Sequence, residues 1–333
     1  MYKRQSYNFA RSSDAVFCEE VSFKEYSQLE NDNTEVIHKT DKTIFYINKY
    51  FSLNDNSVIF SNTYLVNELF TILKNRNSDV TGLKLISHQA DHKIDKKIFN
   101  QKPLNITEWF GINIEHEDKN LVPLPLGISN TYSPKNLRLE DFKKYFNSEK
   151  TIFVYSNFQV NTNYFERVKI RNQVQKKSFI TTQNPELGIQ NYAEKLSKSN
   201  FVICPPGNGI DTHRFWESLY FNSIPIALKH LTHNAAKDIP VLFIDSYENI
   251  SEEKCNKYLN YIQNEKINYE SLTMDYWLKK INYKKKSGQN QNEVNLSNQE
   301  IQSIKETFHR TLKRETIYKN LYTFGRKLHN KLN

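Results

Sequence analysis

The 333-residue sequence predicts an α/β fold built from two Rossmann-like domains. Short apolar runs of strand length alternate along the chain with segments of helical spacing, a pattern typical of sheets with crossover helices. The length is also sufficient for two domains of ordinary size. A turn signal at Ser133-Pro134 and the charged residues that follow it place the boundary between residues 148 and 149.

Residues 1–148 are predicted to form the first domain. The segment TYLVNELFTILKN, residues 63–75, has its apolar residues at the spacing of an amphipathic helix. The apolar runs predicted as strands or strand ends are residues 43–47, 57–60, 83–87 and 120–128.

Residues 149–285 are predicted to form the second domain, with strands and helices in the β-α-β-α order of a doubly wound sheet. The predicted strands are residues 151–156, 178–182, 201–204, 223–228 and 241–245. The predicted helices are residues 164–177, 191–199 and 211–221.

Residues 286–333 are predicted as a polar linker and a basic C-terminal helix. Residues 284–299 carry almost no apolar side chain, which favours a loop. Helical spacing returns from Ile301 to Leu332, with eight Lys or Arg against two Glu. This helix either braces the first domain or contacts an anionic membrane surface.

The composition limits the class of partner without choosing one. The net charge of +9 suits a nucleoside diphosphate, a nucleic acid or an anionic membrane. Cys18, Cys204 and Cys255 are too scattered for a disulfide framework, and no CxxC pair indicates zinc. Because no run approaches the roughly 18 apolar residues of a membrane span, we expect a cytoplasmic protein, soluble or peripheral at the inner face of the membrane.

The segment FVICPPGNGIDTHRFWESLYFNSIPIALKH, residues 201–230, concentrates the residues suited to binding an anion. A buried strand ends at Cys204, and Pro205-Pro206 prevents its continuation. Gly207, Asn208 and Gly209 let the backbone turn and approach a ligand closely. Asp211 or Thr212 is placed to cap the helix that follows, whose free amide groups attract phosphate.

Polar side chains in the first turns of that helix add to the predicted site. Arg214 can bind a phosphate in a fork geometry. Glu217, three residues later on the same face, can accept hydrogen bonds from ribose hydroxyls. His213 and Trp216 are either ligand contacts or packing residues. Many α/β proteins contain strand-glycine-helix turns without such a site, so the combination of residues carries this prediction.

The stretch PPGNGIDTHRFWESLYFNSIPI resembles the C-terminal signature of exostosin-like glycosyltransferases, and the resemblance extends over residues 154–247. The signature combines a Pro-x-Gly turn, an Arg-x-x-Glu pair and an Ile-Pro-Ile strand. Asn222 stands where such proteins often have glycine before this strand, and Asn also tolerates a left-handed turn.

The resemblance implies a GT-B glycosyltransferase, a hexosyl- or pentosyltransferase with two Rossmann-like domains facing each other across a cleft. The second domain would bind the nucleotide sugar, with uridine diphosphate preferred, and the first a glycan acceptor in surface polysaccharide or glycoconjugate synthesis. The family usually inverts the anomeric carbon and works without a metal, so neither a metal nor a cofactor besides the donor is expected.

Inversion needs one general base to deprotonate the acceptor hydroxyl. SHQADHKID follows the predicted strand 83–87, so its side chains lie at a strand's carboxyl end. Asp91 is the preferred base, followed by His88 and His92, and Glu115 with His116 is the reserve pair. The alternative is a solvated loop in which Asp91 or Asp95 only caps the next helix.

Other candidates follow from the rule that ligands bind beyond the carboxyl ends of parallel strands. Ser156 and Asn157 follow the first strand of the second domain and are predicted to bind the diphosphate or the sugar. Arg167 and Lys169 are basic helpers or members of a solvated helix face. His230 and residues 232–234 follow the strand at 223–228 and are placed to contact the base or the sugar.

Two other functions stay open. A fucosyltransferase-like GT-B enzyme shares the Arg/Lys-Glu helix and the Pro-containing strand that follows it. A non-enzymatic protein that binds nucleic acid or an anionic surface would explain the positive charge. No interleaving of aromatic and basic residues typical of nucleic-acid modules stands out, so we expect no nucleic-acid partner.

Overall fold

The computed structural model describes residues 5–76, 79–129, 137, 139–145, 148–183, 185, 188–282 and 290–332. The chain forms two compact units. The first unit comprises Phe9–Gly111, Asp118–Leu121 and Ile281–Asn333, and the second comprises Met1–Asn8, Ile112–Glu117 and Val122–Lys280. Residues 122–148, which the sequence assigns to the first domain, therefore belong to the second unit. The predicted turn at Ser133-Pro134 lies outside the described residues.

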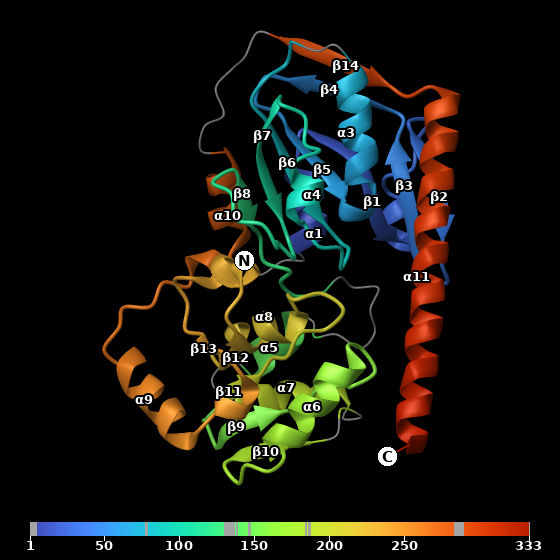
Figure 1. Ribbon diagram of the computed structural model, residues 1–333. Helices are drawn as coiled ribbons and strands as arrows, with labels where there is room; N and C mark the ends of the chain where they lie inside the picture. The colour runs from blue at the N-terminus through green and yellow to red at the C-terminus, as the bar shows by residue number, and fades with distance from the viewer. Residues whose placement is uncertain are drawn as a thin grey trace. The chain divides into compact units, whose positions relative to one another are not determined.

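The second unit contains a five-stranded parallel sheet with the order β10-β9-β11-β12-β13 (Figure 1). Its strands are β9 (Ile152–Ser156), β10 (Ile180–Thr182), β11 (Ser199–Ile203), β12 (Ile224–Leu228) and β13 (Leu242–Ile244). The main connecting helices are α6 (Tyr164–Val174), α7 (Ile189–Ser197) and α8 (His213–Tyr220). Every strand and helix predicted in this half is present within a few residues, which confirms the predicted Rossmann-like α/β architecture. Asn222 adopts the left-handed conformation with φ 54°, as the resemblance requires of this position.

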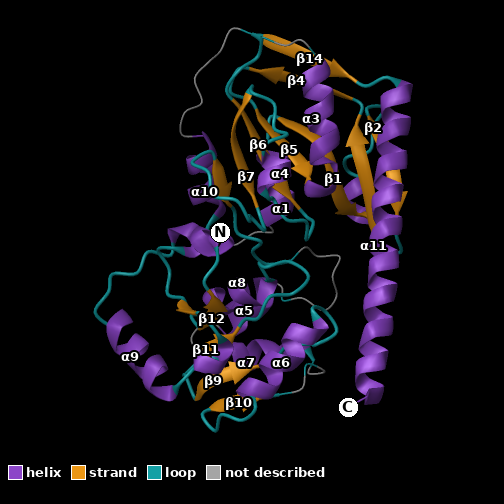
Figure 2. Ribbon diagram, in the orientation of Figure 1, coloured by secondary structure: helices purple, strands orange, loops and turns teal. Residues whose placement is uncertain are grey.

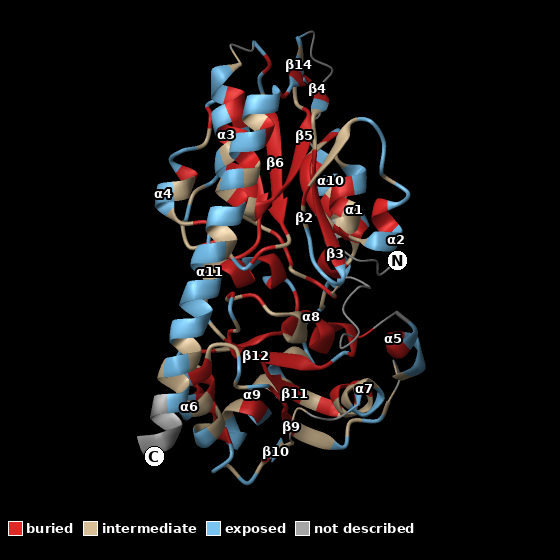
Figure 3. Cartoon of the chain, turned by 90° about the vertical axis from the view of Figure 1, so that its right-hand side faces the viewer, coloured by how far each residue is buried: buried red, intermediate tan, exposed pale blue. Residues whose placement is uncertain are grey.

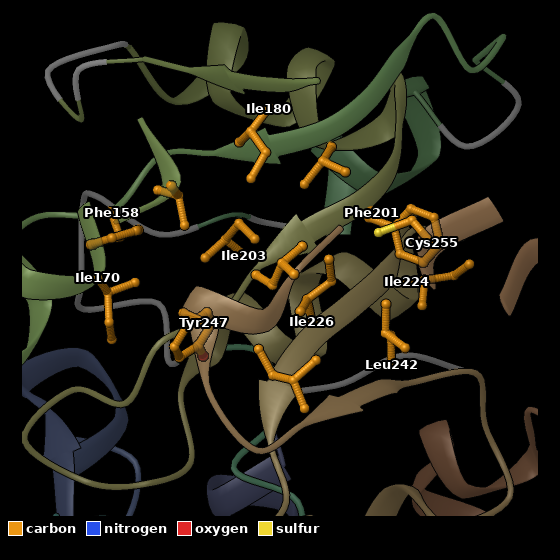
Figure 4. Packing of buried hydrophobic residues seen from close by; sticks show 14 residues of the cluster. Phe158, Ile170, Ile180, Phe201, Ile203, Ile224, Ile226, Leu242, Tyr247 and Cys255 are labelled. Carbon is orange, nitrogen blue, oxygen red and sulfur yellow. The ribbon is translucent and has the colours of Figure 1, made fainter. Parts of the chain in front are cut away.

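Further helices complete the second unit. They are α5 (Leu139–Tyr145), η2 (Leu231–Ala236), η3 (Tyr247–Asn249), α9 (Glu252–Ile262), η4 (Glu270–Leu272) and α10 (Met274–Asn282). One face of the sheet packs into a buried cluster that includes Val154, Phe201, Ile203, Ile226 and Tyr247 (Figure 4). Val154, Phe201, Ile203 and Ile226 come from the neighbouring parallel strands β9, β11 and β12, and Tyr247 comes from η3. Strands buried in this way read as continuous apolar runs.

The first unit contains a seven-stranded mixed sheet with the order β2-β3-β1-β5-β6-β7-β8. Its strands are β1 (Ala15–Ser22), β2 (Thr34–Lys39), β3 (Thr43–Asn48), β5 (Val58–Asn62), β6 (Leu83–His88), β7 (Ile106–Gly111) and β8 (Leu121–Pro123). The neighbours β1, β5, β6 and β7 are parallel, whereas β3 pairs antiparallel with both β1 and β2. This parallel core is also Rossmann-like, with an antiparallel extension at one edge (Figure 2).

Short helices and a two-stranded sheet accompany the large sheet. The helices are α1 (Gln5–Ser12), α2 (Phe23–Tyr26), η1 (Thr63–Leu65), α3 (Val66–Asn75) and α4 (Lys96–Phe99). The small sheet pairs β4 (Tyr50–Asn54) with β14 (Gln291–Asn295) in antiparallel register. Part of the segment predicted as a polar loop is therefore a strand, anchored by the buried Val294. Residues 283–289 of that segment lie outside the description.

The C-terminal helix α11 (Asn298–Leu332) packs on the first unit through its N-terminal part. Ile301, Ile304 and Phe308 are buried. The ring of Phe308 lies 4.5 Å from that of Phe45 and 5.9 Å from that of Tyr64, measured between centroids. Later turns of the helix are mostly exposed (Figure 3).

Phe308→Ala tests how much this packing stabilises the first unit. Removing a fully buried ring leaves a cavity, and we expect a loss of about 3–5 kcal/mol in the free energy of unfolding. Urea denaturation followed by circular dichroism measures it. Phe324→Ala is the matched control on the same helix, because Phe324 is 61% exposed. Equal effects of the two substitutions would contradict the packing role of Phe308.

Candidate functional site

The strand order of the second unit marks one place in its sheet as the expected ligand site. Numbered in chain order within the unit, the strands run 2-1-3-4-5. The connections leave in opposite directions from the first and third strands, β9 and β11, and ligands bind beyond the carboxyl ends of such a pair. Ser156 and Asn157 follow β9, and the loop from Cys204 to Gly209 follows β11. The predicted residues of both segments therefore meet at this switch point.

The loop after β11 is held by a buried arginine. Arg167, on α6, donates through Nε to the carbonyl oxygen of Pro206 at 2.7 Å and through Nη2 to that of Pro205 at 3.3 Å. Its Nη1 donates to the carbonyl oxygen of Gln159 and to Thr162 Oγ1, each at 2.8 Å. All three guanidinium nitrogens of Arg167 thus donate hydrogen bonds to acceptors of the protein itself.

Burial of Arg167 corrects one expectation. The alternative of a solvated helix face is wrong for this residue, which is 6% exposed, whereas Lys169 on the same helix is exposed. Burial, together with the smaller effect of the nearby Arg214 charge, lowers the pKa of Arg167 to about 10. Arg167 therefore positions the loop instead of presenting its charge to a ligand.

Two glycines of the loop are required for close packing. A Cβ on Gly207 would lie 3.2 Å from Arg167 Nη2, and a Cβ on Gly209 would lie 2.7 Å from Asn113 Nδ2. The Gly207 N–H donates to the carbonyl oxygen of Gly209 at 2.9 Å, which closes the turn. Asn208, between them, is exposed. Neither glycine has a positive φ, so close approach explains both residues.

Arg214, in the first turn of α8, is the cation left for a ligand. Its Nε is buried and has no hydrogen-bond partner among the described residues. The guanidinium carbon lies 5.7 Å from the centroid of the Tyr192 ring. A buried guanidinium N–H without a partner is costly, and an anion at this place would satisfy it.

Glu217 lies one turn deeper on α8 and is buried. Its Oε2 accepts a hydrogen bond from Tyr192 Oη at 2.9 Å. Burial raises the pKa of Tyr192 well above its ordinary value, so the phenol keeps its proton and acts as the donor. Tyr155, on β9, also keeps its proton, because burial raises its pKa to about 12 against the opposing effects of a hydrogen bond with Asn157 and the charge of Arg214.

The N-terminus of α8 carries no side-chain cap. Thr212 is the N-cap residue, but its side chain accepts no backbone hydrogen bond, so the expectation that Asp211 or Thr212 caps this helix is wrong. The carboxylate of Asp211 instead accepts hydrogen bonds from Trp216 Nε1 at 2.8 and 2.9 Å and from the Leu126 N–H at 2.8 Å. Asp211 and the fully buried Trp216 are therefore structural partners.

His213 is half-buried, and its Nδ1 lies 2.7 Å from the carbonyl oxygen of Gly127. Because a carbonyl oxygen can only accept, Nδ1 carries the proton and Nε2 is available as an acceptor in the neutral ring. The sequence left open whether His213 packs or contacts a ligand, and this geometry allows both.

The residues after β12 pack the domain. His233 stacks on Phe215 at 4.7 Å and on Phe243 at 5.9 Å, between centroids. Burial lowers its pKa to about 4, so the ring is neutral. His230 caps η2 by accepting from the Thr232 N–H at 3.2 Å, and Asn234 is exposed.

The three residues predicted as catalytic lie at and just after the carboxyl end of β6 in the first unit. His88 is buried at the end of β6, and its Nδ1 accepts from the Gln89 N–H at 2.8 Å. Asp91 is exposed and His92 is half-exposed. The ring of His92 lies 4.7 Å from that of Tyr64, which sequence reasoning missed.

The remaining acidic and basic candidates have separate places. Asp95 caps α4 by accepting from the Ile98 N–H at 2.8 Å. Glu115 and His116 are half-exposed and belong to the segment Ile112–Glu117 of the second unit. No group of three or more His, Cys, Asp or Glu in the described parts of the chain is arranged to hold a metal ion.

Sequence reasoning also missed Tyr155, Tyr192 and Asn113. The first two are aromatic residues that read as ordinary core positions. Asn113 has a left-handed φ of 52° and accepts from the Asp211 N–H at 3.0 Å. An isolated Asn far from the motif carries no signal of that contact.

Comparison with known proteins gives only distant similarity. No family model and no curated protein sequence matches the chain. An α1,3-fucosyltransferase solved with GDP-fucose aligns at 14% identity and a TM-score of 0.32, covering 75% of this chain and 77% of its own.

Two other glycosyltransferases align less well. AviGT4, involved in avilamycin A biosynthesis, has 9% identity and a TM-score of 0.29, covering 77% of this chain and 84% of its own. The pneumococcal O-GlcNAc transferase GtfA, solved with UDP and GlcNAc, has 9% identity and a TM-score of 0.27, covering 78% and 58%. TM-scores this low carry no assignment of function.

Asp211→Asn tests the structural role of the buried carboxylate. An amide cannot accept at both positions, so at least one buried donor loses its partner, which costs about 1–3 kcal/mol of unfolding free energy. Urea denaturation measures the loss. Asp245→Asn makes the same change at an exposed position and should have almost no effect.

Comparing wild type with Asp211→Asn at different pH values also tests the pKa of Asp211, which burial raises from 3.8 to about 7. The folded chain then holds this proton more tightly between about pH 4 and 7, so the contribution of Asp211 to stability is full below about pH 4 and is lost as the pH rises through about 7. The difference in unfolding free energy between wild type and Asp211→Asn should therefore be larger at about pH 5 than at about pH 8. A difference independent of pH would contradict the raised value.

Proposed function

We propose that this protein is a glycosyltransferase that transfers a sugar from a nucleoside diphosphate sugar to a hydroxyl group of a glycan acceptor. One observation carries the proposal: Arg214, a half-buried residue of the first turn of α8, has a buried Nε that finds no hydrogen-bond partner among the described residues. A diphosphate bound there would accept hydrogen bonds from the guanidinium of Arg214 and from the uncapped backbone N–H groups of α8.

The surrounding residues support a nucleotide sugar as the source of that diphosphate. Glu217 would accept hydrogen bonds from ribose hydroxyls, and its hydrogen bond with Tyr192 would fix its orientation. Ser156, Asn157 and the Gly207–Gly209 turn would line the diphosphate or the sugar. His213 offers Nε2 to a hydroxyl donor, and Asp211 serves the site by holding Trp216 and the backbone of Leu126.

The proposed reaction inverts the anomeric carbon in a single displacement. The acceptor oxygen forms a bond to that carbon while its proton passes to a general base, and the bond to the diphosphate breaks with both electrons on the leaving oxygen. Asp91 is the preferred base because it is exposed, whereas His88 is buried and His92 is half-exposed. Charge on the leaving diphosphate would be balanced by Arg214 and the helix dipole, without a metal.

Uridine diphosphate is the proposed carrier and an exostosin-like enzyme of surface polysaccharide synthesis the proposed type. Guanosine diphosphate would favour the fucosyltransferase-like alternative. Calorimetric titration with uridine, guanosine and cytidine diphosphates, followed by a panel of their sugars, tests the function. Absence of binding to all three nucleotides, with a mixed oligonucleotide bound instead, would refute it.

Arg214→Ala should weaken binding of the preferred nucleoside diphosphate by about 10- to 100-fold, because one charge-assisted hydrogen-bond donor is lost. Isothermal titration calorimetry measures this. Lys169→Ala removes the same charge from an exposed position in the same unit and should leave the affinity unchanged. Equal affinities of wild type and Arg214→Ala would exclude Arg214 from the site.

Asp91→Asn should reduce transfer by about 10²- to 10⁴-fold while nucleotide affinity stays constant, because the amide cannot accept the proton. Asp95→Asn is the matched control, since Asn retains the helix cap that Asp95 provides. Normal turnover of Asp91→Asn would reject this base and direct the same test to His88 and His92.

A further inference from the structure

The helix α11 changes its surroundings along its length. Its first three turns are buried through Ile301, Ile304 and Phe308. Further along the same side, Glu315 accepts a hydrogen bond from Tyr64 Oη at 2.9 Å. Residues two positions apart on a helix lie about 200° apart around its axis. The face that begins at Ile317 is therefore turned away from the one that holds Tyr64.

That second face carries a stripe of exposed apolar side chains, which we call the apolar stripe: Ile317, Tyr318, Leu321 and Phe324. Their exposed fractions are 51%, 69%, 65% and 61%. Ile317, Leu321 and Phe324 have the spacing i, i+4, i+7 and so form one continuous line. Four of the ten exposed large apolar side chains in the described chain fall within these eight residues, whereas the others are scattered.

Positive charge surrounds the apolar stripe. Residues 309–327 contain one acidic side chain, Glu315, which is already occupied by Tyr64. Lys313 and Arg314 are exposed and lie one turn before Ile317. Being four and three residues before it, they neighbour Ile317 on opposite sides of the apolar stripe. The basic residues of this stretch are Arg310, Lys313, Arg314, Lys319, Arg326 and Lys327.

We propose that the apolar stripe docks on the surface of an anionic lipid bilayer, with Lys313 and Arg314 contacting the headgroups. Apolar side chains at one helix face with basic residues beside them are the features of a helix that lies in the membrane interface. Ile317, Leu321 and Phe324 would enter the acyl boundary. No helix in the described part of the chain is long and apolar enough to span a membrane, and an interfacial helix does not need to be.

A second copy of the chain fits this face less well. Stable protein interfaces bury about 1,200–2,000 Å², more than a stripe of two helical turns offers. Pairing two stripes in parallel would also bring the Lys313 and Arg314 side chains of both copies together, and like charges repel. A nucleic acid would use the charges but leaves the apolar side chains without a partner.

The experiment is cosedimentation of the full chain with vesicles of phosphatidylcholine alone and of an equal mixture with phosphatidylglycerol. We expect binding to the mixed vesicles only, weakening as salt is added. Lys313→Gln with Arg314→Gln should lower the affinity for the mixed vesicles about 30-fold, because each basic side chain near an anionic surface contributes a factor of about 5 to 6. Ile317→Gln, Leu321→Gln and Phe324→Gln together should lower it about 100-fold or more, because buried apolar area is lost.

Matched controls place the same changes elsewhere. Phe165→Gln with Tyr261→Gln replaces two exposed aromatic residues, and Lys169→Gln with Lys257→Gln removes two exposed charges. Both controls should bind vesicles like wild type. Retained nucleotide affinity in the stripe variants shows that they are folded and separates this proposal from the proposed enzymatic function.

Three outcomes would overturn the proposal. They are no binding of wild type to the mixed vesicles, equal binding to phosphatidylcholine alone, and stripe variants that bind as tightly as wild type. Sedimentation velocity adds a fourth: a dimer of the wild type that the apolar substitutions abolish would identify a second copy as the occupant instead.

Discussion

The hydrogen bonds of Arg167 to the carbonyl oxygens of Pro205 and Pro206 are the interaction on which the site of the second unit depends. Two successive prolines offer no N–H groups, so the backbone at Pro205 and Pro206 cannot be held through its own amides. A buried guanidinium supplies the missing donors. The loop is thereby fixed beside α6, and the N-terminus of α8 is left open toward the carboxyl edge of the sheet.

The two arginines of this region differ in their partners. Arg167 donates to protein acceptors through all three nitrogens, whereas the buried Nε of Arg214 has no acceptor in the described part of the chain. Burial lowers the pKa of Arg167, and the charge of Arg214 contributes to the same shift; an anion between or beside the two residues would relieve their repulsion. A site preorganised in this way spends little of its binding energy on rearranging side chains.

Sequence patterns predicted the second unit well and the first only in part. The parallel strands of the second unit are buried on both faces, so SFITT, FVIC and SIPIAL read as plain apolar runs. In the first unit, β1 contains Glu19 and Glu20 and β2 is half polar, which hides both strands from a search for apolar runs. Glu19 is nonetheless buried, because Arg11 and Tyr46 bind its carboxylate.

The site was predicted to the extent that local sequence determines it. Ser156, Asn157, Arg214 and Glu217 lie at one strand edge because parallel strands end there together. The contacts that decide their roles could not be predicted from the sequence, since Arg167, Tyr192 and Asn113 come from distant segments. Asp211 has a buried tryptophan as its partner five residues later, and nothing in the local pattern distinguishes that from a ligand contact.

The contacts of Asp211 and Gly209 also determine where this chain can be divided. Asn113, Leu126 and Gly127 precede β9, yet they hold the start of α8 and its preceding turn. A fragment that starts at residue 149 would contain every strand of the second sheet and still lack these three partners. Dissection of the chain into separately expressed halves therefore has to retain residues that are far upstream of the sheet they support.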